Sequence, residues 1–150
     1  MKNFLLGILK FLKNIFIMAN VLPPRKQPED VKFLFELQDN IKNFRLDQGV
    51  MPLNYSMPLE YFAQQNADLN YKSRYLLDQP NEDLMRMQLR MQDLYFKRII
   101  FLAVFCDSTP MDATRLLLSN SKYRAALTDG FLTTIAIAKC GSYISIILAN

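Results

Sequence analysis

The sequence predicts a mainly α protein: a compact bundle of about five or six helices, preceded by a hinged amphipathic helix. Three observations favour this class. Apolar residues recur at helical spacing within residues 2–18, 28–45 and 82–106. Prolines and acidic residues stand where these helices would begin. An apolar share of 51% with 21% charged residues is typical of a globular chain, and 150 residues suffice for one domain.

The first 26 residues carry all of the excess positive charge. They hold five of the 18 basic residues and no acidic one, so the remaining 124 hold 13 basic residues against 14 acidic ones. A helix with lysines on one side and Phe, Leu and Ile on the other favours contact with an apolar, negatively charged surface. The residues expected at this contact are Lys2, Phe4, Leu5, Ile8, Leu9, Lys10, Leu12, Lys13, Ile15 and Phe16.

Pro23 and Pro24 end this first helix and stiffen the chain that follows it. The sequence therefore predicts three parts: an amphipathic helix over residues 1–18, a proline-rich hinge over 19–28 and a helical domain over 29–150.

The domain is expected to open with a helix over 28–45. Pro28 suits its first position, and Glu29 and Asp30 place negative charge in the first turn, where the helix dipole favours it. Gly49 and Pro52 then indicate a loop. Further helices are expected at 58–66, 68–78, 82–106, 110–119 and 122–129.

Three basic residues, Arg86, Arg90 and Lys97, would lie along one stripe of the long helix over 82–106. Such a stripe is able to bind phosphates. Because Asp93 interrupts it, the preferred interpretation is a solvated helix face, and nucleic-acid binding is not favoured.

Residues 131–149 allow three interpretations, since Lys139 is their only charged residue. A buried helix interrupted at Gly141 is favoured. A β-hairpin turning at Cys140 and Gly141 comes second. A membrane span comes last, because Lys139 near its centre would cost about 2.5–3.5 kcal/mol.

The composition argues against catalysis. The chain has no histidine, and its four glycines are isolated, so neither a triad nor a glycine-rich phosphate loop is available. We expect no enzyme activity, no cofactor and no metal site. The two cysteines, Cys106 and Cys140, show no disulfide or metal spacing and favour a reducing compartment. Lys139 beside Cys140 suggests a lowered thiol pKa.

From these features the sequence predicts a non-catalytic structural or adaptor subunit of a larger membrane-associated assembly, docked through its N-terminal amphipathic helix. The expected partners are a membrane surface or an apolar partner subunit, in a hetero-oligomeric assembly. The alternative is a soluble helical module that recognises a protein or, with less support, RNA.

Overall fold

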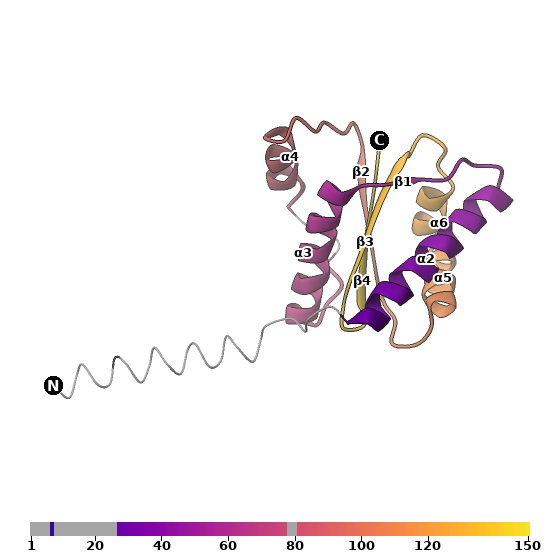
Figure 1. Cartoon of the computed structure of the whole chain (residues 1–150), viewed down its shortest axis with the longest axis horizontal. Helices are drawn as coiled ribbons and strands as arrows, with labels where there is room; N and C mark the ends of the chain where they lie inside the picture. The colour runs from indigo at the N-terminus through magenta and orange to yellow at the C-terminus, as the bar shows by residue number, and fades with distance from the viewer. Residues whose placement is uncertain (1–6, 8–26, 78–80) are drawn as a thin grey trace.

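A four-stranded sheet with helices on both faces forms the centre of the computed structural model, which describes residue 7 and residues 27–77 and 81–150 (Figure 1). The fold is α/β, and the predicted helical bundle is wrong. In chain order the elements are α2 (Pro28–Asp47), β1 (Asn54–Tyr55), α3 (Met57–Ser73), α4 (Glu82–Arg90), β2 (Ile99–Phe105), α5 (Pro110–Ser119), α6 (Ser121–Leu127), β3 (Thr134–Cys140) and β4 (Tyr143–Ala149).

The sheet is mixed, with the strand order β1–β3–β4–β2. β3 and β4 form an antiparallel hairpin in which Ile137 lies opposite Ile146, and β2 runs antiparallel to β4. β1 runs parallel to β3, but it is only two residues long and pairs with Thr134 and Ile135 alone. Beyond Ile135, the outer edge of β3 therefore has no strand partner among the described residues.

The hairpin of β3 and β4 resolves the three interpretations of residues 131–149. The hairpin is correct, and the favoured buried helix is wrong. Gly141 has φ +59°, a left-handed conformation that glycine adopts readily in a tight turn. All seven residues of β4 are buried, because helices cover both faces of the sheet. A strand buried on both faces shows no polar alternation and resembles a buried helix in sequence.

The predicted helix over 82–106 is correct at its start, Glu82, and wrong in its second half. α4 ends at Arg90, and β2 begins at Ile99. The apolar residues of its second half belong to a strand rich in β-branched and aromatic side chains, which pack well on a pleated surface. The helices expected at 58–66 and 68–78 form the single helix α3, whereas those expected at 28–45 and 110–119 match α2 and α5 closely.

No described helix is both long enough and apolar enough to cross a lipid bilayer.

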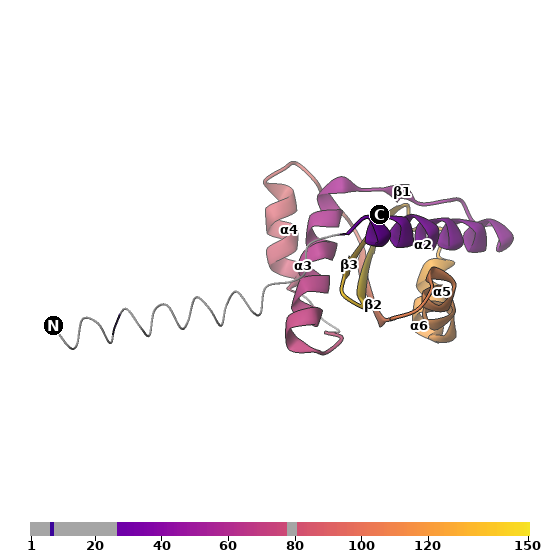
Figure 2. The same ribbon diagram turned by 60° about the horizontal axis from the view of Figure 1, so that its bottom comes forward.

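Two apolar cores lie on opposite faces of the sheet. Helices α2, α5 and α6 cover one face, and α3 and α4 cover the other (Figure 2). On the first face Leu37, Leu117 and Ile146 pack together, and on the second face Leu59, Leu89 and Ile147 do so. Because Ile146 and Ile147 are adjacent in β4, they enter different cores.

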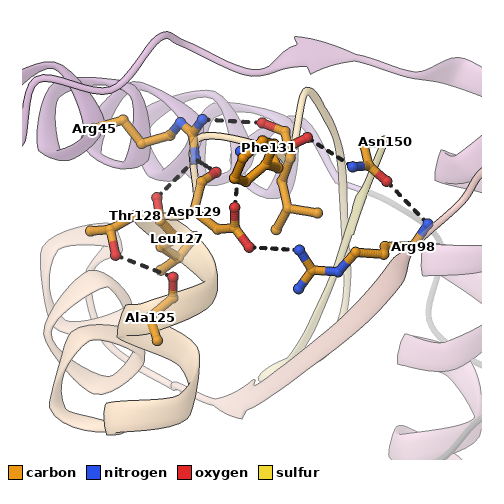
Figure 3. A network of polar contacts seen from close by, with 9 residues as sticks. Arg45, Arg98, Ala125, Leu127, Thr128, Asp129, Phe131 and Asn150 are labelled. Carbon is orange, nitrogen blue, oxygen red and sulfur yellow. Dashed lines mark hydrogen bonds and ion pairs between the residues drawn. The ribbon is translucent and has the colours of Figure 1, made fainter.

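Arg45, in the last turn of α2, fixes that helix to the segment that leads into β3 (Figure 3). Its side chain is 1% exposed, and it donates hydrogen bonds to four backbone carbonyls. These carbonyls belong to Met51 (2.7 Å), Leu127 (3.0 Å), Asp129 (3.2 Å) and Leu132 (3.2 Å). Burial lowers the pKa of Arg45, and the negative charge of Asp129 opposes that shift. The single guanidinium of Arg45 thus joins the end of α2 to the loop at Met51, to the end of α6 and to the segment before β3.

Candidate functional site

An apolar groove between α2 and the start of α3 is the strongest candidate for a functional site. We call it the α2–α3 groove. Its volume is about 400 Å³, within the range that small-molecule sites occupy. Its walls are Val31, Leu34, Phe35, Gln38, Tyr55, Met57, Glu60 and Ile137.

The groove exists because β1 is so short. β1 pairs with β3 only at Thr134 and Ile135, so Ile137 lies beyond the end of the paired segment. There, α2 and α3 flank β3 from its two faces (Figure 2). Side chains from α2 and from the junction of β1 and α3 therefore form the walls around Ile137.

The start of α3 is fixed by a helix cap, which places the polar wall of the groove. The side chain of Ser56 accepts a hydrogen bond from the backbone N–H of Leu59 (3.3 Å), and Glu60 follows in the first turn. Next to it, the hydroxyl of Tyr55 donates to the carbonyl of Ile137 (3.4 Å). Burial, assisted by the negative charge of Glu60, raises the pKa of Tyr55 to about 12. The phenol therefore stays neutral near pH 7 and acts as a donor.

Farther along β3, an ion pair joins the strand to α2. Lys139 Nζ lies 2.9 Å from Asp30 Oδ1, and both side chains are largely buried. The ammonium also lies 5.1 Å from the centre of the Phe33 ring. The side-chain amide of Gln64 donates to the carbonyl of Lys139 (3.1 Å). These contacts hold α2, β3 and α3 together next to the groove.

A second cavity of about 290 Å³ adjoins the groove and shares Phe35 and Gln38 with it. Its other walls include Asp39, Lys42 and Pro52, so it is more polar. The Phe35 side chain is 65% exposed although it lines both cavities. An exposed aromatic ring beside two adjoining cavities is available to cover a bound molecule.

The residues that the sequence predicts at a functional contact lie elsewhere. The ten residues predicted between Lys2 and Phe16 fall outside the described part of the chain, so their contact with a membrane surface or an apolar partner stays a prediction. Arg86, Arg90 and Lys97 do not share a helix face, because α4 ends at Arg90. The Arg86 guanidinium instead donates to the carbonyls of Phe96 and Lys97. Arg86 therefore holds the segment between α4 and β2 against α4.

Both cysteines are buried, and they lie on opposite faces of the sheet. Cys106 packs in the core under α2 and α5, and Cys140 packs in the core under α3. They therefore cannot pair within one chain, and their free thiols give no information about the redox compartment. Burial, reinforced by the negative charge of Asp68, raises the pKa of Cys140 to about 12, opposite to the shift suggested by its sequence position.

We expect both thiols of the folded protein to react slowly with a disulfide reagent at pH 8, because both are buried and the reagent has poor access to them. The measurement is the time course of reaction with a chromogenic disulfide reagent, in buffer and in denaturant. Slow reaction in buffer and fast reaction of both thiols in denaturant are expected. Fast reaction of the native Cys140 would contradict its described environment.

Chemically, the groove is suited to binding. Its one carboxylate, one phenol and one amide stand among five apolar side chains, and Cys140 does not line it. Within residues 27–77 and 81–150, no three Cys, Asp or Glu side chains are grouped so as to hold a metal ion.

Comparison with known proteins shows similarity of fold only. No protein-family model matches the chain, and no curated protein matches its sequence. Among solved structures, a cysteine-rich secretory protein from Staphylococcus aureus aligns with a TM-score of 0.71 at 17% identity. An extracellular protein containing an SCP domain from Bacillus anthracis aligns at 0.68 and 12%, and an outer surface protein from Borrelia burgdorferi at 0.69 and 14%.

These alignments cover 84%, 85% and 84% of this chain, and 40%, 45% and 96% of the three neighbours in the same order. The chain thus spans less than half of the first two neighbours. The neighbours are secreted or surface proteins with the same α/β fold. They overturn the prediction of a helical adaptor subunit in a membrane-associated assembly and its alternative of a helical binding module.

Sequence reasoning missed the residues of the groove. Phe35 stands within the helix expected over 28–45, and Tyr55 stands between that helix and the one expected over 58–66, so neither has a signal of its own. One signal was available: Leu34 and Phe35 are consecutive apolar residues, so the apolar face of this helix is wider than one core contact requires.

Proposed function

We propose that this chain is a non-catalytic binding domain that holds a small apolar molecule in the α2–α3 groove. The observation that carries this proposal is the exposure of large apolar side chains around a formed cavity. Phe35 is 65% exposed and Met57 is 69% exposed, and both line the 400 Å³ groove. Exposed apolar surface that lines a concave site is typical of ligand binding.

The absence of catalytic chemistry at the groove supports the non-catalytic part of the proposal. The sequence has no histidine to act as a general base. The Tyr55 phenol is a weak acid in this setting, because its pKa is about 12. The side chains of the groove therefore supply shape, apolar contact and a few hydrogen bonds.

We also propose that the domain works outside the cytoplasm or at a cell surface. The support is the naming of its structural neighbours as secretory, extracellular and outer surface proteins. Brief protease treatment of intact cells that make the protein tests this. Loss of the protein while a cytoplasmic marker survives is expected, and its full protection would contradict the proposed location.

Replacing Phe35 with Gln should weaken binding of a neutral, environment-sensitive naphthalene dye by about tenfold, because the ring contributes apolar contact to the ligand. Glutamine preserves helix propensity, and an exposed side chain contributes little to folding, so the thermal midpoint should stay nearly unchanged. Dye fluorescence titration and a thermal melt are the two measurements.

The matched control is Phe131→Gln. Phe131 is 79% exposed and is not among the groove residues, so this variant should bind the dye like the parent chain. Equal loss in both variants would mean that the dye binds exposed apolar surface in general. No loss in Phe35→Gln would remove the support for the groove.

A further inference from the structure

The two cavities beside α2 are consecutive stretches of one trough. On α2, the walls of the α2–α3 groove lie within residues 31–38, and those of the second cavity lie within residues 35–45. On the opposite side, the wall moves from Ile137 to Ile135, two residues back along β3. Both walls therefore continue from one cavity into the next.

The trough has the dimensions of an extended chain. Its cavities have volumes of about 400 and 290 Å³, and they share Phe35 and Gln38. An α-helix rises about 1.5 Å per residue, so Leu34 in the first cavity and Lys42 in the second lie about 12 Å apart along the axis of α2. A long, narrow molecule can therefore occupy both cavities at once.

The two ends of the trough differ in polarity. Five of the eight side chains that line the α2–α3 groove are apolar, whereas the second cavity adds Asp39 and Lys42. Both of these side chains are exposed, and no ion pair joins either one to another described residue. Arg45 also lines the second cavity, but its guanidinium is buried and already donates to four carbonyls. A group bound at this end therefore meets one negative and one positive side chain.

We propose that the molecule held in the α2–α3 groove is a free, single-chain amphiphile with a zwitterionic head group. Its tail lies in the groove against Leu34 and Ile137, and its head lies in the second cavity beside Asp39 and Lys42. A head of one charge would meet one attractive and one repulsive side chain, whereas a head with both charges is complementary to both. This inference rests on the proposed function, because the tail occupies the same groove.

The order of the charges along α2 selects the probe. With increasing distance from the groove, Asp39 comes first and Lys42 follows three positions later. A head group with its positive charge next to the tail and its negative charge at the end has the matching order. N-decyl-N,N-dimethylglycine is such a molecule, and decanol is an uncharged molecule with the same tail.

Titration of the isotope-labelled full chain with each molecule tests the head group. Amide chemical shifts, measured below the concentrations at which micelles form, give both the location and the affinity of binding. Both molecules should shift Phe35 and Ile137 saturably, and only the zwitterion should also shift Asp39 and Lys42.

Neutralising either charge should affect the zwitterion alone. Asp39→Asn and Lys42→Gln, made singly, should each weaken binding of N-decyl-N,N-dimethylglycine about threefold, because an exposed charge contact contributes modestly to binding. Neither substitution should change the affinity for decanol, because decanol has no charge to meet either side chain.

The matched control is Lys32→Gln/Glu36→Gln, which removes an exposed ion pair from the same helix but alters neither cavity, and it should bind both molecules like the parent chain. Circular dichroism confirms that each variant is folded. A loss in only one of the two single variants would indicate a head of one charge and overturn the inference, as would no loss in either or an equal loss for decanol. Each of these results leaves the proposed function standing if decanol binds in the groove, whereas a chain that binds neither molecule would overturn both.

Discussion

Replacing Arg45 with Met should lower the free energy of unfolding by about 3–5 kcal/mol, the largest loss expected from a single polar residue in this chain. The methionine fills a similar volume but removes the donor from four backbone carbonyls, of which those of Leu127 and Leu132 accept buried hydrogen bonds. Arg45→Lys should recover only part of the loss, because a single ammonium cannot reproduce the planar fork of a guanidinium. Urea denaturation followed by circular dichroism measures both variants.

Arg124→Met is the matched control for Arg45→Met. Arg124 is an exposed residue on α6 whose guanidinium lies 5.4 Å from the centre of the Phe44 ring, so its loss should cost less than about 1 kcal/mol. Similar losses for the two arginines would show that the buried network of Arg45 contributes no special stability.

Ile146→Ala and Ile147→Ala should each lower the free energy of unfolding by about 2–5 kcal/mol. Ile146 is 1% exposed and Ile147 is fully buried, and they pack in the two cores on opposite faces of the sheet. Each truncation leaves a cavity that a central strand cannot close. The same urea denaturation measures the loss.

The comparison for this pair is Leu116→Ala on α5, where the side chain is 45% exposed and the expected loss is small. If only one of the two isoleucines proved costly, β4 would be buried on one face alone, contrary to the two helical layers.

The sequence predicted the elements whose signals are local. Pro28 with Glu29 and Asp30 indicated the start of α2, and α5 begins at Pro110, the first residue of the helix expected over 110–119, with Thr109 as its cap. Each start was recognisable because a proline, a capping side chain and a carboxylate act within a single turn of helix.

β2 was missed, and the β3–β4 hairpin was placed second to a buried helix, because burial removes the pattern that identifies a strand. β2 and β4 lie under helices, so their residues are apolar almost throughout and show no alternation. In β3 the alternation is weak, since Ala136 and Ala138 are apolar and buried like Ile135 and Ile137.

The groove depends on contacts that local sequence does not reveal. It brings Phe35 of α2, Met57 of α3 and Ile137 of β3 to the walls of one cavity, although they are distant in the chain. It also depends on β1 being only two residues long, and a two-residue strand has no periodicity to detect. Only the order of the strands in the sheet places these residues together.

The most direct test of the proposed function is to map where a neutral apolar molecule binds. Titration of the isotope-labelled chain with decanol, followed by amide chemical shifts, gives this map. The groove predicts saturable shifts that are centred on Phe35, Gln38, Tyr55, Glu60 and Ile137 and are lost in Phe35→Gln. Shifts centred instead on the exposed Met87 of α4 and on Met91 just after it, or no saturable shift at all, would contradict it.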